Sequence, residues 1–370
     1  MQYFRPNINS MEAYAPGEQP QDGEFVKLNT NESPYPPFDD VLEAIRREVD
    51  GRLRLYPDPL CTRVRRQAAR VFNVDPDMVI VGNGSDDILT ITVRSFVGDG
   101  GKVVYLNPSY GLYGVLADIQ NAKKCPIEYT DDYRLPPEIR QPDAKLTFIC
   151  TPNNPTGTVT PPEEVAKVAE RSHGIVAVDE AYADFAEQSC VDLVHRCDNI
   201  LVLRSLSKSY SLAGLRIGLG IGNANLIAGM MKVKDSYNVQ RLGIAGAEAA
   251  LANVDKMKAN AEKVKENRRY LAGQLEKLGF DVLPSQANFI FARPPMWHGH
   301  LARETDSRPG RPTRLRAGAL YEELKTRRIL VRYWNLPRLS DGIRISIGTR
   351  QELDAFLAAT KEIFAGYNRK

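Results

Sequence analysis

Residues 200–216 read ILVLRSLSKSYSLAGLR, and they contain the most informative side chain of the chain, Lys208. The run 200–203 is short and apolar, which is typical of a buried strand. Two serines and the lysine follow directly after it. A lysine in a crowded, water-poor site loses its proton more readily and then attacks carbonyl carbons to form a Schiff base. The stretch therefore predicts a strand that ends at a nucleophilic lysine.

Groups that bind phosphate lie close to Lys208 in the sequence. Ser205 and Ser207 supply hydroxyls, and Arg216 returns eight positions after the lysine with a guanidinium. Such donors suit a phosphate group. A phosphate next to a lysine that attacks an aldehyde indicates pyridoxal 5'-phosphate (PLP) as cofactor. A Ser-x-Lys pattern alone would favour an ordinary surface turn, so the interpretation depends on the rest of the chain.

Composition places the chain among ordinary soluble globular proteins. It has 370 residues, of which 43% are hydrophobic and 26% charged, and a chain of this length usually forms two domains. A net charge of +3 is too small to indicate nucleic acid or an acidic membrane surface. The start lacks the apolar run of a signal peptide, and no stretch is long enough to cross a bilayer. We therefore expect a cytoplasmic protein.

The cysteines favour neither a disulfide framework nor a metal centre. They number five and are scattered along the chain, and an odd, scattered set argues against paired disulfides. The nearest approach to a metal pattern is Cys190, His195 and Cys197, which lacks a fourth ligand and the usual spacing. We expect no bound metal.

Short apolar runs alternate with helical patterns between about residues 60 and 235. The predicted strands are 78–82, 102–106, 145–150, 174–178, 200–203 and 216–221, with helices at 60–72, 86–97, 111–120 and 161–171. This alternation predicts an α/β fold with a mostly parallel sheet between helices. A long helical stretch at 239–277 and a mixture of strands (287–292, 329–333, 343–347) and helices (317–327, 351–365) follow. We predict an arm (1–40), a large domain (41–277) and a smaller α+β domain (278–370).

Residues 293–316 differ from their surroundings in composition. The segment contains two prolines and many arginines. A nucleic-acid or partner loop is one interpretation, but no aromatic residues alternate with the arginines as base stacking requires. We predict a solvated insertion in the smaller domain.

Residues 81–87 read VGNGSDD and lie between a predicted strand and a predicted helix. Glycines allow a tight turn, and the free N–H groups of a helix N-terminus attract anions. Ser85 and the backbone at Asp86 are therefore candidate phosphate ligands. The glycines do not complete the dinucleotide-binding spacing. A plain strand–helix turn remains the alternative.

Two further strand ends carry side chains that suit a pyridine ring. Asp179 follows the strand 174–178, and a carboxylate paired with the ring nitrogen keeps that nitrogen protonated. Tyr182 lies three residues further on and is suited to donate to the ring's phenolic oxygen, as is Asn154 in the turn 150–157. Tyr110, after the strand 102–106, is a candidate for stacking on the ring. Taken singly, Asp179 would be a helix cap and Tyr110 an ordinary core residue.

Residues 343–349 alternate isoleucine with polar residues, so Arg344 and Ser346 share one face of a predicted strand. An arginine there is suited to bind a substrate carboxylate through two parallel hydrogen bonds. A solvated strand face is the alternative.

Together these motifs resemble the fold-type I, class I/II family of PLP-dependent aminotransferases over about residues 10–365. The matching set is Asn154-Pro155-Thr156-Gly157, Asp179, Tyr182, Ser205, Lys208, Arg216 and Arg344, in the family's order. The resemblance implies that Lys208 bonds to the cofactor and then moves protons. It also implies that Asp179 binds the ring nitrogen, and that Tyr182 and Asn154 bind its oxygen. Tyr110 is expected on the ring face, and Ser85, Asp86, Ser205, Ser207 and Arg216 around the phosphate.

Within that family the chain is most similar to the histidinol-phosphate aminotransferases. The segments 14–17 (YAPG), 27–35 (KLNTNESPY) and 55–59 (LYPDP) carry this similarity, as do Arg332 and Arg344. The resemblance implies a homodimer in which Tyr56 reaches the neighbouring subunit's cofactor phosphate. It also implies substrate contacts from Tyr14, Asn31, Arg332 and Arg344. The bulky 333–335 (YWN) differs from the expected pattern and is predicted to reshape the phosphate pocket.

We therefore expect transamination between histidinol phosphate and 2-oxoglutarate in histidine biosynthesis. An aromatic amino-acid aminotransferase and a threonine-phosphate decarboxylase are the enzymatic alternatives. A catalytically silent PLP-fold regulator is the non-enzymatic one, although it would require a lost lysine or an added DNA-binding domain.

Overall fold

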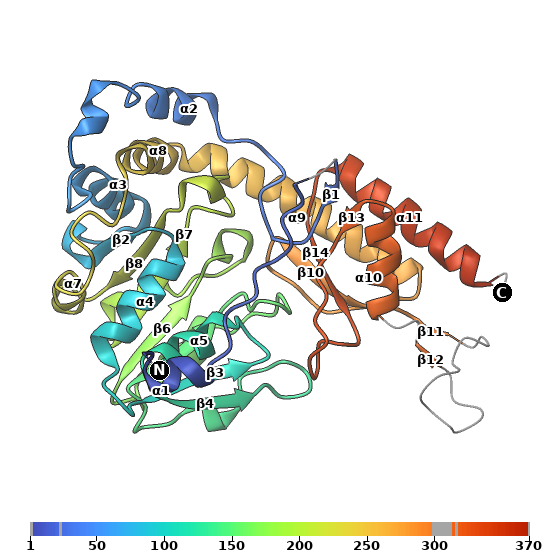
Figure 1. Cartoon of the computed structure of the whole chain (residues 1–370), viewed down its shortest axis with the longest axis horizontal. Helices are drawn as coiled ribbons and strands as arrows, with labels where there is room; N and C mark the ends of the chain where they lie inside the picture. The colour runs from blue at the N-terminus through green and yellow to red at the C-terminus, as the bar shows by residue number, and fades with distance from the viewer. Residues whose placement is uncertain (1–2, 22–23, 298–312, 315–316, 369–370) are drawn as a thin grey trace.

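The computed structural model describes residues 3–21, 24–297, 313–314 and 317–368. Its larger part is built on a seven-stranded sheet in the order β2-β8-β7-β6-β5-β3-β4 (Figure 1). The strands are β2 (Val79–Gly82), β3 (Lys102–Asn107), β4 (Lys123–Glu128), β5 (Leu146–Cys150), β6 (Ile175–Asp179), β7 (Ile200–Ser205) and β8 (Gly218–Gly222). All run parallel except β8, which pairs antiparallel with both β2 and β7. The predicted α/β fold with a mostly parallel sheet is confirmed.

Both faces of this sheet are covered by helices, which explains why its central strands are apolar on both sides. Along β7, Leu201 and Leu203 pack toward α4 (Ser85–Phe96) and α5 (Leu112–Ile119), whereas Val202 packs toward α6 (Pro162–Ala169). The other helices of this part are α3 (Thr62–Phe72), α7 (Ala224–Met230) and α8 (Arg241–Ala252). Because successive strand residues alternate between faces, one short apolar run fills two cores.

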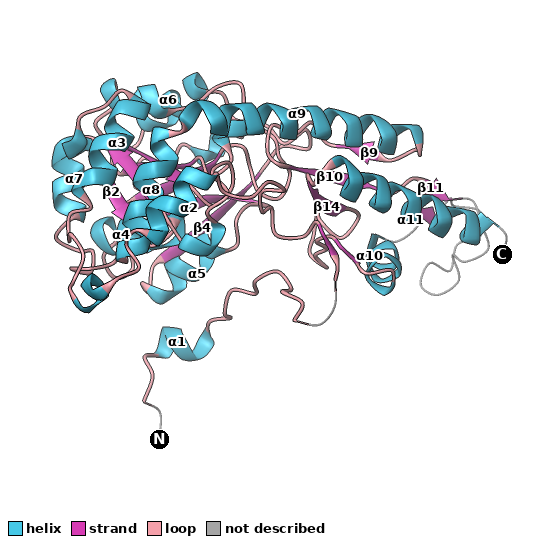
Figure 2. Cartoon of the chain, turned by 90° about the horizontal axis from the view of Figure 1, so that it is seen from above, coloured by secondary structure: helices cyan, strands magenta, loops and turns pink. Residues whose placement is uncertain are grey.

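The predicted long helical stretch 239–277 is helical in the structure, but it is divided into two helices. Helix α8 ends at Ala252, and α9 (Val254–Lys277) starts directly after Asn253. The Asn253 N–H donates to the Ala250 carbonyl, and its Nδ2 group donates to the Ala249 carbonyl at 2.7 Å. An asparagine side chain that bonds to nearby carbonyls competes with helix continuation. Helix α9 then runs from the large sheet into the second part of the chain (Figure 2).

The second part is built on a three-stranded antiparallel sheet in the order β14-β10-β9. Its strands are β9 (Asp281–Val282), β10 (Phe289–Arg293) and β14 (Ile343–Ser346), and its helices are α10 (Ala317–Thr326) and α11 (Arg350–Asn368). The predicted strand 329–333 is shorter, since only β13 (Ile329–Leu330) is a strand and Arg332 forms a single bridge with Arg344. Both faces of β14 are buried, so Arg344 does not lie on a solvated face.

The N-terminal segment contains little regular secondary structure. It contains the short helix α1 (Pro6–Ser10) and strand β1 (Val26–Lys27), and α2 (Asp39–Arg46) begins inside it. Strand β1 pairs in parallel with β13, which is about 300 residues away in the sequence. Only tertiary pairing defines so short a strand. Most of the segment's residues are neither helix nor strand, which agrees with the few helical signals of the sequence, and the arm limits 1–40 stay a prediction.

Sequence patterns also missed β4, the edge strand of the large sheet. Its residues read KKCPIE, and most of them are exposed or half-buried. Lysines and a proline are typical of an edge strand that is protected from pairing with another sheet. In the arginine-rich segment, β11 (Met296–Trp297) pairs with β12 (Thr313–Arg314). Residues 298–312 and 315–316 lie outside the described residues, so the predicted solvated insertion stays a prediction. No helix in the described ranges is long and apolar enough to span a membrane.

The packing of the large sheet gives a stability prediction. Phe148 is fully buried in β5, and its ring stacks on that of Tyr113 with 4.5 Å between centroids. Phe148→Ala should lower the free energy of unfolding by about 3–5 kcal/mol, because the surrounding residues cannot fully close the cavity left by the lost ring. Phe4→Ala is the matched control, since Phe4 is 69% exposed and its change should stay within about 0.5 kcal/mol. Urea unfolding curves measure both, and equal losses would contradict the packing described.

Candidate active site

A cavity of about 470 Å³ lies where the carboxyl ends of the parallel strands face the second part of the chain. In open α/β sheets, ligands bind at this edge. The predicted residues that line the cavity are Tyr14, Asn31, Ser85, Asp86, Tyr110, Asn154, Asp179, Tyr182, Ser205, Ser207, Lys208, Arg216, Arg332 and Arg344. Residues from distant positions in the sequence are thus brought to one site, and of the predicted set only Tyr56 lies elsewhere.

Lys208 lies in the loop that follows β7. Its Nζ donates to the Thr30 carbonyl at 3.3 Å and lies 5.9 Å from the centre of the Tyr182 ring. The pKa of Lys208 is lowered to about 8, mainly by burial and in addition by the nearby Arg344 guanidinium. A lysine with this pKa is partly neutral near pH 7, as a nucleophilic amine must be.

Asp179 ends β6 on the same edge of the sheet. Its Oδ2 accepts a hydrogen bond from the Tyr113 hydroxyl at 2.8 Å, and its Oδ1 accepts one from the Ala181 N–H at 3.1 Å. Burial raises the pKa of this carboxyl to about 6, although the Tyr113 hydrogen bond opposes the shift. Sequence reasoning missed Tyr113 because it lies in a helix with an apolar pattern and no motif marks it.

Tyr182 is connected to the second part of the chain by a short chain of hydrogen bonds. Asn31 donates to the Tyr182 hydroxyl at 3.1 Å, and its Oδ1 accepts from the Ser346 hydroxyl at 2.9 Å. Asn31 has a positive φ of 56°, a conformation that asparagine tolerates better than most residues. Burial raises the pKa of Tyr182, so its hydroxyl stays protonated and is able to donate at neutral pH.

An anion cradle is formed where α4 begins. Gly84 has a φ of 91°, and a Cβ atom at this position would lie 2.5 Å from Nη2 of Arg216. Arg216 donates to Asp86 Oδ2 at 3.2 Å and to the Ser207 hydroxyl at 3.4 Å. The N–H groups of a helix start, serine hydroxyls and a guanidinium are the donors that bind phosphate.

Tyr110 lies beside this cradle. Its hydroxyl donates to Asp86 Oδ1 at 3.1 Å, and its ring meets the Tyr14 ring edge-on with 5.6 Å between centroids. Burial raises the pKa of Tyr110. The two tyrosines come from α5's preceding loop and from the N-terminal segment, so the arm contributes an aromatic wall to the pocket.

Two arginines of the second part face the cavity. Arg344 donates to Asn154 Oδ1 and to the Asn29 carbonyl, both at 2.6 Å, and burial lowers its pKa to about 10. Arg332 donates to the carbonyls of Ala15 and Pro16 at 3.1 Å. Within the described residues, neither guanidinium is paired with a carboxylate. Two cations held by neutral oxygens make this end of the pocket attractive to anions.

Trp334 lies between these arginines, with each guanidinium carbon 5.1 Å from its ring centre. It lines the pocket together with Leu336, Pro337 and Leu339. The sequence analysis singled out the bulky Trp334 but not Leu336, Pro337 and Leu339. These apolar side chains give no motif, and only their position in the fold places them at the cavity.

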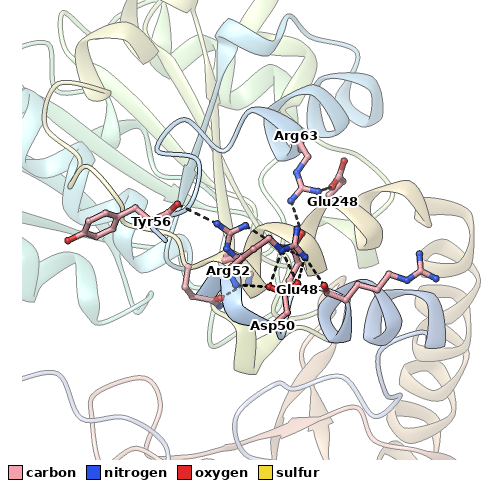
Figure 3. Close-up of polar contacts among 10 residues, drawn as sticks. Glu48, Asp50, Arg52, Tyr56, Arg63 and Glu248 are labelled. Carbon is pink, nitrogen blue, oxygen red and sulfur yellow. Dashed lines mark hydrogen bonds and ion pairs between the residues drawn. The ribbon is translucent and has the colours of Figure 1, made fainter. Parts of the chain in front are cut away.

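Tyr56 lies outside the cavity and is 78% exposed, stacked on Tyr237 with 4.3 Å between ring centroids. Its backbone carbonyl accepts from Arg241 at 3.5 Å, and Arg241 in turn contacts Glu48 at 3.2 Å. Figure 3 shows Glu48 within a cluster of arginines and the Tyr56 ring directed away from it. The segment is thus anchored while its tyrosine is presented outward.

The arrangement is suited to chemistry on an amine that also carries anionic groups. A reactive lysine and a buried carboxyl flank a cavity with an anion cradle at one end and two arginines at the other. The described ranges contain no group of three or more His, Cys, Asp or Glu side chains placed to hold a metal ion.

Comparison with known proteins agrees with this geometry. The family profile "Aminotransferase class I and II" matches residues 23–359. A histidinol-phosphate aminotransferase from Geobacter sp. is 42% identical over 364 residues, covering 98% of this chain and 99% of that protein. One from Synechocystis sp. is 43% identical over 356 residues, covering 96% and 97%. The crystal structure of histidinol-phosphate aminotransferase from Sinorhizobium meliloti in complex with pyridoxal-5'-phosphate superposes with a TM-score of 0.85 at 26% identity. It covers 99% of this chain and 98% of that one.

The chain belongs to the class I and II aminotransferases. The family resemblance predicted from the motifs is confirmed, and so is the assignment of the chain as an enzyme of the transferase class.

The lowered pKa of Lys208 gives a prediction for cofactor-free protein. At pH 7 a pKa of about 8 leaves about a tenth of the amine neutral, against fewer than about one in a thousand for an ordinary lysine. The neutral fraction rises as the pH rises through 8. Brief labelling with limiting acetic anhydride and peptide mapping should therefore show Lys208 modified with a midpoint near pH 8. Surface lysines should keep gaining label toward about pH 10, and an identical profile for Lys208 would contradict its desolvation.

Proposed function

We propose that the protein is a PLP-dependent aminotransferase that exchanges an amino group between histidinol phosphate and 2-oxoglutarate. The observation that carries the proposal is the placement of Lys208 and Asp179 in one cavity with a phosphate cradle and two arginines that lack carboxylate partners among the described residues. The names of relatives at 42% and 43% identity over nearly their whole length support the substrate.

The residues present fit PLP. A side chain at Gly84 would collide with the Arg216 guanidinium, so the glycine lets this phosphate-binding group lie against the start of α4. Asp179 would bind the pyridine nitrogen, and Tyr182 and Asn154 would donate to the ring oxygen. Ser85, the backbone at Asp86, Ser205, Ser207 and Arg216 would hold the phosphate, with Tyr110 against the ring. When bound, PLP supplies an aldehyde for the amine exchange and a ring that withdraws electrons from the substrate's Cα.

Lys208 would act twice through its Nζ atom. Its Nζ would hold the aldehyde of PLP, and as a free amine it would accept the proton from the substrate's Cα and return it. A pKa of about 8 allows the same amine to accept and return a proton. Asp179 stabilises a protonated ring nitrogen, because a cation next to it favours the carboxylate form.

The two arginines would divide the anionic groups of the substrates between them. Arg344 is buried beside Asn154 and Asn29 and is suited to the carboxylate of glutamate. Arg332 donates to the carbonyls of Ala15 and Pro16 and is suited to the phosphate of histidinol phosphate. Tyr14 and Asn31 complete the substrate side of the pocket.

An aromatic amino-acid aminotransferase is a second candidate, which the rings of Tyr14 and Trp334 in the cavity favour. A threonine-phosphate decarboxylase would use the same phosphate contacts. A silent regulator has no such support, because Lys208 is present. We further propose the domain limits 41–277 and 278–370, and a homodimer in which Tyr56 of one subunit completes the other's site.

A half-reaction series tests the substrate. PLP-loaded enzyme is mixed with histidinol phosphate, phosphothreonine, phenylalanine or glutamate, and conversion to the amine form is followed by absorbance. We expect rapid conversion by histidinol phosphate and glutamate. Arg332→Ala should slow the phosphate-bearing donor by about tenfold or more relative to glutamate, because one charge-assisted contact is lost. The rate of Arg332→Lys with the phosphate-bearing donor should lie between those of the wild type and Arg332→Ala, since lysine keeps the charge but cannot form two parallel hydrogen bonds.

Conversion by phenylalanine alone would replace the proposal with the aromatic enzyme. Release of carbon dioxide from phosphothreonine would replace it with the decarboxylase. Equal losses with histidinol phosphate and glutamate in Arg332→Ala would contradict the separate roles of the arginines.

A mixing experiment tests the shared site. Tyr56→Phe and Lys208→Ala subunits are each expected to be impaired, but a hybrid dimer contains one site with both native residues. Random mixing should restore about a quarter of wild-type activity, since half the dimers are hybrids with one intact site of two. Replacing the second partner by a Tyr56→Phe, Lys208→Ala double variant should remove the gain. No gain in the first mixture would count against the dimer.

A further inference from the structure

The pocket has an apolar wall whose position is fixed by a residue that does not line it. We call residues 334–339 the pocket wall. Trp334, Leu336, Pro337 and Leu339 line the cavity, and Leu336 is 52% exposed. The wall is a turn between the Arg332 bridge and β14 rather than a strand or helix. A turn of this kind needs an anchor to keep a defined shape.

Arg338 provides that anchor by crossing to the large-sheet part. Its Nη1 donates to the Tyr129 carbonyl at 2.6 Å, and its Nη2 donates to the Thr130 carbonyl at 2.7 Å. The guanidinium also lies 4.9 Å from the centre of the Tyr133 ring. The Tyr133 hydroxyl donates back to the Arg338 carbonyl at 3.3 Å. The wall and the turn 128–133 thus hold each other by reciprocal contacts, and Figure 1 shows the loop before β14 close to the end of β4.

Both partners of this contact have an unusual backbone. Arg338 has a φ of 62° and Tyr133 a φ of 58°. A positive φ is unfavourable for a side chain other than glycine, and such residues persist where the surrounding contacts determine them, often at functional sites. The contact therefore stabilises a local conformation that neither segment would favour alone.

The same contact reaches the opposite side of the cavity. Glu128 contacts Arg338 at 3.4 Å through Oε2, and its Oε1 accepts from Asn107 at 2.5 Å. Asn107 lines the cavity and begins the loop that carries Tyr110. Arg338 therefore connects the pocket wall, through Glu128 and Asn107, to the loop that carries Tyr110.

We propose that Arg338 is a positioning residue for substrate binding. By fixing the pocket wall to the turn 128–133, it determines affinity for the amine substrate and leaves cofactor binding unaffected. The inference rests on the proposed function only in that the cavity binds an amine donor. It does not depend on which donor, and the test uses whichever donor the wild-type enzyme converts best.

The main variant is Arg338→Gly, because glycine accepts the positive φ and the change removes the contacts without adding backbone strain. The half-reaction of the PLP-loaded variant should show the donor concentration for half-maximal rate raised by about tenfold, as small displacements of a pocket wall reduce binding. The maximal rate, the cofactor absorbance spectrum and PLP retention on dialysis should stay at wild-type values. Arg338→Lys should recover part of the affinity.

Arg134→Ala is the matched control. Arg134 lies just after the same turn, is highly exposed and pairs with Asp132 rather than with the wall, so its removal should leave donor affinity unchanged. A second readout follows the wall itself. The chain has two tryptophans, so a Trp297→Phe background leaves Trp334 as the only tryptophan whose emission is followed. Arg338→Gly should then increase its quenching by acrylamide.

An unchanged donor affinity in folded Arg338→Gly enzyme would overturn the proposal, as would an equal loss in Arg134→Ala. Loss of PLP retention together with donor affinity would also overturn the proposal, because Arg338 would then have a general structural role. If the wild-type enzyme converts the other donors but not histidinol phosphate, the substrate assignment falls while the role of Arg338 still stands. Should Arg338→Gly not fold, Tyr133→Leu removes the ring and hydroxyl from the other side and must produce the same affinity loss.

Discussion

Removal of the Lys208 amine from water is the constraint on which the site depends. Burial lowers the pKa of this lysine to about 8, and the same burial raises the pKa of Asp179 to about 6. Each shift moves a group toward its neutral form, because a low-dielectric site disfavours charge. The pocket therefore contains an amine able to attack and a carboxyl whose charge depends on a nearby cation. Neither property belongs to the residue type by itself.

The fold provides this burial by bringing strand ends together. In the large sheet, β2 and β5–β7 end at one edge, where Asp179 closes β6 and the loops after β2 and β7 carry the anion cradle and Lys208. The second sheet covers that edge and adds Arg344, which is itself buried and contributes to the lowered pKa of the lysine. Catalytic and substrate-binding groups thus come from different parts of the chain, so that their relative placement sets the chemistry.

The N-terminal segment belongs to the site as much as the sheets do. Thr30 accepts from Lys208, Asn31 bonds to Tyr182, and the carbonyls before Gly17 accept from Arg332. An extended segment has unpaired backbone groups that must find partners, and here many of those partners are pocket side chains. This explains why the segment reads as a loose arm in the sequence although Leu28, Asn29 and Asn31 are buried at the site.

The sequence by itself determined the α/β fold, the family and most of the pocket. Local signals sufficed because strand-end motifs such as Ser205-x-x-Lys208 and Asp179-x-x-Tyr182 combine a periodic apolar run with chemistry that is rare elsewhere. Only the tertiary structure decided the break at Asn253, the β1–β13 pairing, the Tyr113 contact with Asp179 and the clamp of Arg338 on Tyr129 and Thr130. These depend on contacts between segments far apart in the chain or on a single amide bonding a nearby carbonyl. No periodicity or motif predicts such contacts, because they stabilise the protein only after folding has brought their partners together.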